Sequence, residues 1–292
     1  MASITDSLLV IGVSDSGKSH YGGQLLIRLR KRLGLLKSAV APASIKGFDE
    51  VLTCLSEGKS APHTASTFYG TVTLPLVDSE GNRIDLHWPD YGGEQIKNIR
   101  DDRLMTLEWK ERLLKSKGWL FFIRPNAARN REDIILRPTS GDDLTSPDTS
   151  QEAPHENKVA AWSEQAANIE LLQMLLYAKG VGSTHPVSTP YLAIILSCWD
   201  EIKLPKKNKK HPPIELLAET MPLFAEFIST NWNEDAYSVF GVSSQGKALS
   251  DKIPDEEYLD NGPQSFGYVI LPDGNQDDDL TLPVARILER LI

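Results

Sequence analysis

Apolar and polar positions follow one another along the chain in the order expected of a layered α/β protein. The run LLVIGV, at residues 8–13, has the continuous apolar character of a strand that is buried on both faces of a parallel sheet. After a glycine-rich turn, leucines recur at helical spacing through residues 19–34, with basic residues between them and Gly34 as a stop. The chain therefore opens with a predicted strand, loop and helix.

The rest of the pattern predicts a hairpin and further alternation. Residues 66–93 consist of two β runs joined by a turn at SEGN, and the second run ends at Asp90. Further helices are predicted at 44–60, 96–117, 159–180, 214–232 and 281–292, and further strands at 119–125, 189–200 and 235–246. This alternation predicts a three-layer α/β/α sandwich with a mostly parallel sheet and one antiparallel strand.

Two stretches lie outside this alternation. Residues 125–158 are polar and rich in Pro, Ser and Asp, which predicts an exposed, flexible insertion. Residues 262–292 form a C-terminal extension that ends in the final predicted helix. Because the chain is long enough for one large core, we expect residues 1–292 to form a single domain.

Composition excludes several classes of protein. The 292 residues carry a net charge of −9, which argues against a general binder of nucleic acid or of anionic membranes. Cys54 and Cys198 are the two cysteines, far apart in sequence, so we expect neither a disulfide nor a zinc site. No stretch approaches the ~20 apolar residues that span a bilayer, and the N-terminus lacks a signal-peptide pattern. These features predict a cytoplasmic protein.

The glycine-rich loop after the first strand carries the first candidate chemistry. It matches the pattern G-x-x-x-x-G-K-[ST] through Gly12, Gly17, Lys18 and Ser19. The backbone N–H groups of residues 14–19 would wrap the β-phosphate, Lys18 would reach the β- and γ-phosphates, and the Ser19 hydroxyl would ligate Mg²⁺. The predicted nucleotide contacts also include Ser14, Asp15, Ser16 and, over the first helical turn, His20. The loop predicts a P-loop NTPase fold.

Three later motifs follow predicted strands. In D-Y-G-G, the Asp90 carboxylate can hold Mg²⁺ through a water and the Gly93 N–H can contact the γ-phosphate. Asp200 can accept two N–H hydrogen bonds from guanine, whereas adenine presents the wrong pattern of donors and acceptors. Ser243 and Ser244 can contact the guanine O6 atom. Each motif alone could be a strand-ending turn, but their order favours a GTP-binding protein.

In this order the motifs resemble the P-loop GTPases of the translation-factor-related class, which contains Ras and Arf, over roughly residues 6–250. The resemblance implies that Gln245 joins the two serines in the terminal guanine loop. It also implies a first-switch threonine that ligates Mg²⁺, and Thr64 is preferred over Thr67 because it lies in the loop proper. Glu94 stands where many members have a water-orienting Gln, so we expect slow hydrolysis of GTP. The hydrolysis step is assigned to Lys18, Gly93, Glu94 and Thr64.

The base-reading motif departs from the family pattern N-K-x-D. It is S-C-W-D here, with Ser197 in place of Asn and Cys198 in place of the Lys that packs along the base. A P-loop ATPase therefore remains an alternative, as does a nucleotide-binding interaction module without hydrolysis. The chain is also similar to the double-GTPase families of bacterial conflict systems, which implies a switch for partner proteins in bacterial antiviral defence. Candidates for an arginine finger are Arg124, Arg129 and Arg131.

Overall fold

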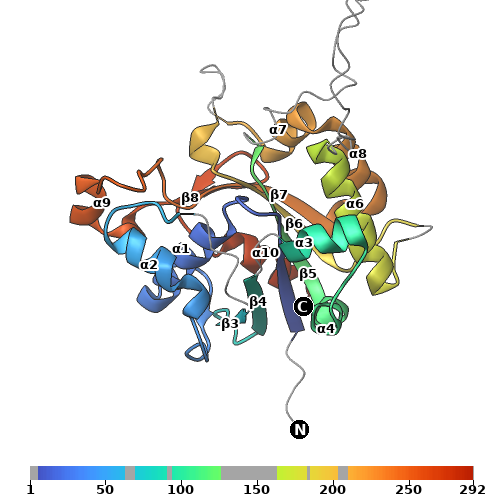
Figure 1. Cartoon of the computed structure of the whole chain (residues 1–292), viewed down its shortest axis with the longest axis horizontal. Coiled ribbons are helices and arrows are strands. Elements are labelled where there is room, and N and C mark those ends of the chain that lie inside the picture. The colour runs from blue at the N-terminus through green and yellow to red at the C-terminus, as the bar shows by residue number, and fades with distance from the viewer. Residues whose placement is uncertain are drawn as a thin grey trace, which may run out of the picture.

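The computed structural model (Figure 1) describes residues 6–62, 70–90, 94–125, 163–182, 185–202 and 210–291. The strands are β1 (Asp6–Ile11), β2 (Lys37–Ser38), β3 (Gly70–Val77), β4 (Arg83–Asp90), β5 (Ser116–Ile123), β6 (Tyr191–Ser197), β7 (Tyr237–Ser243), β8 (Tyr268–Ile270) and β9 (Gln276–Asp277). The α-helices are α1 (Lys18–Lys31), α2 (Asp49–Ser56), α3 (Glu94–Lys97), α4 (Leu107–Lys115), α6 (Glu164–Lys179), α7 (Pro213–Thr220), α8 (Pro222–Asn231), α9 (Glu256–Asn261) and α10 (Leu282–Leu291). The predicted insertion lies outside the described residues, except for its first residue.

The strands of the described chain form one sheet in the order β2-β3-β4-β1-β5-β6-β7-β8-β9. The five strands from β4 to β7 in this order are parallel, while β3 is antiparallel to β4 and β8 is antiparallel to β7. The mostly parallel sheet is therefore confirmed, with a second antiparallel strand, β8, that is too short to show a period in the sequence. Because β1 has β4 on one side and β5 on the other, its carboxyl end is a switch point where ligands bind in such sheets.

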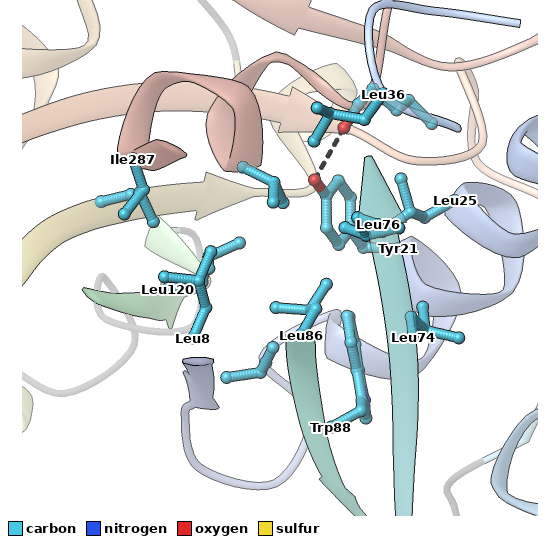
Figure 2. Close-up of a cluster of buried hydrophobic side chains, with 14 of the residues drawn as sticks. Leu8, Tyr21, Leu25, Leu36, Leu74, Leu76, Leu86, Trp88, Leu120 and Ile287 are labelled. Carbon is cyan, nitrogen blue, oxygen red and sulfur yellow. Dashed lines mark hydrogen bonds between the residues drawn. The ribbon is translucent and has the colours of Figure 1, made fainter. Parts of the chain in front are cut away.

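Alternate residues of β1 point into two separate cores, one on each face of the sheet. Leu8 packs in the core that includes side chains of α1 and α10, whereas Leu9 packs in the core that includes those of α4, α6, α7 and α8. Figure 2 shows the first core, where Leu120 of β5 lies in one cluster with Tyr21 of α1 and Ile287 of α10. Figure 1 shows α6, α7 and α8 grouped on one side and α1 and α2 on the other. This is the predicted three-layer sandwich.

The helix predicted over residues 96–117 is broken into several pieces. A π-helical turn, Asn98–Asp102, follows α3, and Arg103 then adopts a left-handed φ of 54° that stops the helix. A new helix starts where the Thr106 side chain accepts a hydrogen bond from the Trp109 N–H at 3.2 Å. Its last turn ends at Lys115, where β5 begins.

The helix predicted over residues 214–232 is likewise two helices, α7 and α8. Pro222 has no N–H to donate to the preceding turn, and it disfavours helical geometry at the residue before it. Met221 accordingly has φ −138° and ψ 62°, and Pro222 becomes the first residue of α8. A single proline thus changes one long helix into two packed ones.

The buried face of α1 is hydrogen-bonded to the C-terminal part of the chain. The Tyr21 hydroxyl donates to the backbone oxygen of Leu280 at 2.7 Å, the bond drawn as a dashed line in Figure 2. The Gln24 side chain is fully buried and donates to the Tyr258 hydroxyl at 2.5 Å. The predicted C-terminal extension begins at residue 262. These bonds join α1 to Tyr258, which precedes this extension, and to Leu280, which lies within it. We propose that the C-terminal extension folds as part of a single domain.

Arg28 makes three more links to the C-terminal part of the chain, although it belongs to a basic helical stretch. Its guanidinium donates to the backbone oxygens of Asp278 at 2.5 Å, Phe266 at 2.7 Å and Gly267 at 3.1 Å. We expect Arg28→Ala to lower the free energy of unfolding by about 3 kcal/mol, because three largely buried carbonyls lose a charged donor. Urea denaturation measures this, with the exposed Arg30→Ala as the matched control. Equal losses in the two variants would contradict the expectation.

Candidate nucleotide-binding site

The glycine-rich loop and the segments after β6 and β7 line one cavity of about 400 Å³. Parallel strands bring their carboxyl ends to the same edge of the sheet, so motifs that are distant in sequence meet there. The predicted site residues that line this cavity are Ser14, Asp15, Ser16, Gly17, Lys18, Ser19, His20, Ser197, Asp200, Ser244 and Gln245. The structure thus joins the predicted phosphate motif to the predicted base motifs.

Other predicted site residues are placed only partly. Asp90 is the last residue of β4 and pairs with Gly70 of β3, and Glu94 is the first residue of α3. The described residues do not include Gly93 or either switch threonine, Thr64 or Thr67. They also do not include Arg129 and Arg131. The roles of these residues in metal binding, water positioning or catalysis stay predictions.

Close packing explains the two glycines of the loop. A Cβ on Gly12 would lie 2.8 Å from the Ser16 Oγ and 3.0 Å from the Phe122 Cβ. Gly17 has a φ of +78°, and a Cβ there would lie 3.0 Å from the Cβ of Ser197. The loop therefore rests directly on Ser197, at the end of β6, so the phosphate motif and the base motif are in contact.

The loop holds one lysine, Lys18, against its own backbone. The Lys18 Nζ donates to the backbone oxygen of Val13 at 2.6 Å and to the Ser16 Oγ at 3.1 Å. Ser16 in turn donates to the same Val13 oxygen at 2.8 Å. Lys18 is also the first residue of α1, whose backbone N–H groups and dipole favour an anion at this end. A lysine, a helix N-terminus and backbone donors together fit a phosphate group.

Asp200 also lines the cavity, and a hydrogen bond from Ser243 orients its carboxylate. The Ser243 Oγ donates to the Asp200 Oδ1 at 2.5 Å and accepts the Gly246 N–H at 2.9 Å. Ser243 is fully buried, whereas Ser244 and Gln245 line the cavity, and the contact of Ser243 with guanine O6 stays a prediction. A carboxylate has further acceptor positions beyond this one bond, so Asp200 stays a candidate for accepting paired N–H donors.

Arg124 and Glu201 also line the cavity, and sequence reasoning did not pair them. Arg124 was a finger candidate because it precedes the insertion, and Glu201 was not singled out. β5 and β6 are parallel neighbours with Ile123 opposite Leu196, so the residues that follow both strands come together. The order of strands in the sheet was the signal that could have found this pair.

His20 connects the site to the start of the predicted first switch segment. Its Nε2 accepts the Ala61 N–H at 3.1 Å and lies 3.2 Å from the Ser60 Oγ. Burial, and then the charge of Arg124, lower the pKa of His20 to about 4. The imidazole is therefore neutral at pH 7, with its proton on Nδ1, and it anchors the segment that leads to Thr64.

This anchoring predicts a pH-dependent stability. The pKa of His20 is lower in the folded protein than the usual 6.5, so the unfolded chain binds more protons between pH 4 and 6.5. Stability therefore rises through this range and is complete above it. From pH 7.5 to pH 5, in metal- and nucleotide-free buffer, we expect wild type to lose about 2 kcal/mol more than His20→Gln, which keeps an acceptor for Ala61. Burial also lowers the pKa of His87, and the comparison with His20→Gln removes this contribution because both proteins contain His87. Stability curves of wild type and His20→Gln that stay parallel with pH would contradict the expectation.

Several solved structures resemble the chain at low identity. A bacterial selenocysteine-specific elongation factor EF-Sec is 13% identical with a TM-score of 0.37, and the match covers 82% of this chain and 26% of that one. The Arl6 BBS3 small GTPase from Trypanosoma brucei, with a bound nucleotide analogue, is 12% identical with a TM-score of 0.36, covering 82% and 87%. A dimerization-deficient mutant of Toc33 from Arabidopsis thaliana is 10% identical with a TM-score of 0.41, covering 99% and 84%. This chain thus spans about a quarter of the EF-Sec chain.

Two further findings are negative. Among curated proteins, none matches by sequence. Across the described ranges, the helices are too short or too polar to cross a membrane.

A family model covers nearly the whole chain. The model described as Double-GTPase 1 matches residues 9–287, a span that includes all four motifs and most of the C-terminal extension. The chain belongs to the Double-GTPase 1 family.

Proposed function

We propose that this protein binds GTP and GDP with Mg²⁺ in the cavity and hydrolyses GTP slowly. One observation carries the proposal: Lys18, at the N-terminus of α1, lines the same cavity as Asp200, whose carboxylate is held by Ser243. The lysine and the helix N-terminus suit phosphates, and the carboxylate suits a base with two neighbouring N–H donors. Membership of a double-GTPase family supports a GTP-binding protein.

Around the phosphates, the chain would supply both hydrogen-bond donors and metal ligands. The backbone N–H groups of residues 14–19 surround the β-phosphate, and the Lys18 ammonium neutralises charge on the β- and γ-phosphates. The Ser19 hydroxyl, which lines the cavity, would hold Mg²⁺ together with Thr64 and, through a water, Asp90. When bound, this ion neutralises the phosphate oxygens.

Hydrolysis would take place near the start of α3. The Gly93 N–H would contact the γ-phosphate, and the Glu94 carboxylate would lie where the attacking water is positioned. A carboxylate next to the γ-phosphate adds negative charge to a step that already spreads negative charge, so we expect slow turnover without a partner. The partner would be a protein that reads the nucleotide state, in the defence role that the family resemblance implies.

The experiment for this proposal combines turnover with hydrogen exchange. We expect single-turnover hydrolysis of GTP well below about 1 s⁻¹. We also expect residues 60–68 and 90–98 to exchange more slowly with a non-hydrolysable GTP analogue than with GDP, because both segments would order on the γ-phosphate. Equal exchange in the two states would reject the switch, and binding without any turnover would favour the interaction module.

A further inference from the structure

The Arg124–Glu201 pair is a second polar arrangement in the cavity, separate from the loop and from Asp200. The Arg124 Nη2 donates to the Glu201 Oε1 at 2.5 Å, and its Nε donates to the Oε2 at 3.2 Å. Two nearly parallel bonds between planar groups fix the orientation of the guanidinium. The side chains of Arg124 and Glu201 remain 35% and 28% exposed, so a ligand in the cavity can reach the guanidinium.

The guanidinium lines the same cavity as the glycine-rich loop and Asp200. Hydrogen bonds to Glu201 raise the pKa of Arg124 against the opposing effect of burial, and the charges of Glu201 and Asp15 raise it further. Asp15 belongs to the glycine-rich loop, and Cys198 begins the turn that contains Asp200. The charge of Arg124 also contributes to the lowered pKa of His20, at the start of α1. Arg124 is therefore close to the loop and to the base-reading segment alike.

The turn after β6 has no basic residue of its own before Ile202. Cys198 occupies its first position, and burial raises the pKa of this thiol to about 11, so the group is neutral at pH 7. Arg124, at the end of β5, instead provides a cation that is ion-paired with Glu201 of this turn. A planar cation suits the face of an aromatic base better than a point charge does, because it can stack on the ring.

We propose that Arg124 is a nucleotide-contacting residue whose guanidinium plane, held by Glu201, stacks on the base of the bound guanine nucleotide. This inference rests on the proposed function and adds one contact to it. Glu201 is the positioning residue, because it acts through Arg124. Under this inference Arg124 does not act as an arginine finger, because its Nε and Nη2 atoms both donate hydrogen bonds to Glu201.

The test compares affinities for GDP, GTP and inorganic pyrophosphate in the presence of Mg²⁺. In Arg124→Ala we expect GDP and GTP to bind about tenfold more weakly, with pyrophosphate affinity unchanged. Arg124→Lys keeps the charge without the plane and should lose most of the same affinity. Glu201→Gln should give a smaller loss in the same direction. The matched control is Arg112→Ala, which removes an arginine that is ion-paired with Glu108 on α4.

Other outcomes overturn the inference in distinct ways. Unchanged GDP affinity with a loss of GTP turnover in Arg124→Ala would identify an arginine finger instead. Full rescue by lysine would show that charge, and not stacking, is what the nucleotide senses. A parallel loss of pyrophosphate binding and of thermal stability would assign the pair a structural role. Absence of guanine-nucleotide binding in wild type would reject the proposed function itself.

Discussion

Replacing Lys18 by alanine is expected to weaken binding of both GTP and GDP by about 100-fold or more. The Lys18 ammonium lies within the loop, 2.6 Å from the Val13 oxygen, on the side of the cavity where the helix N-terminus also favours an anion. Charge-assisted hydrogen bonds to phosphate are among the strongest in proteins, and alanine removes all of them at once. Titration calorimetry with each nucleotide measures the loss.

The matched control for this change is Lys110→Ala, an exposed lysine on α4, which should bind nucleotide as wild type does. Thermal unfolding without nucleotide checks that Lys18→Ala is folded, since the lysine's bonds within the loop are short-range. A folded Lys18→Ala protein that binds GDP within about threefold of wild type would show that the phosphates lie elsewhere.

Asp200→Asn is expected to change the preferred base from guanine to xanthine. A carboxylate accepts two N–H groups, which guanine offers, whereas an amide offers one acceptor and one donor. Xanthine carries an oxygen where guanine carries its amino group, so it matches the amide. We expect GDP affinity to fall by about 100-fold or more and xanthosine diphosphate to become the better ligand, because a mismatched buried polar group is left unpaired.

The structure makes this test clean. Ser243 donates to the Asp200 Oδ1, and the amide oxygen of asparagine can accept the same bond, so the turn should keep its shape. Asp235→Asn is the matched control, because this exposed carboxylate precedes β7, at the opposite end of that strand from Ser243. Loss of GDP binding without any gain for xanthosine diphosphate would contradict the assignment of Asp200 as base reader.

The glycine-rich loop, with the strand before it and the helix after it, could be predicted from sequence because its determinants are local. Gly12, Gly17, Lys18 and Ser19 lie within eight consecutive positions of the chain, and a strand and a helix flank them in an unbroken pattern. The continuous apolar runs likewise predicted strands that are buried on both faces of a parallel sheet. Their carboxyl ends lie at one edge of this sheet, where Asp200 and the loop line the same cavity. Local patterns were sufficient wherever one segment contains the whole arrangement.

Features that depend on strand order could not be predicted. Arg124 and Glu201 are far apart in sequence and meet because β5 and β6 are neighbours. From the sequence alone, Ser243 is one small polar residue at the end of a predicted strand. Its hydrogen bond to Asp200 forms because β6 and β7 are neighbours in the sheet. Arg28 looks like one more exposed cation of a basic helix until the C-terminal segment covers it.

Equilibrium competition on the wild-type protein tests the central claim most directly. Fluorescent GDP is bound in the presence of Mg²⁺ and displaced by GTP, GDP, ATP or ADP. If the protein recognises guanine through Asp200, GTP and GDP should displace the fluorescent GDP at concentrations about 100-fold lower than ATP and ADP do. Equal or better displacement by ATP would contradict the account and leave a phosphate-binding loop beside a base pocket of another specificity.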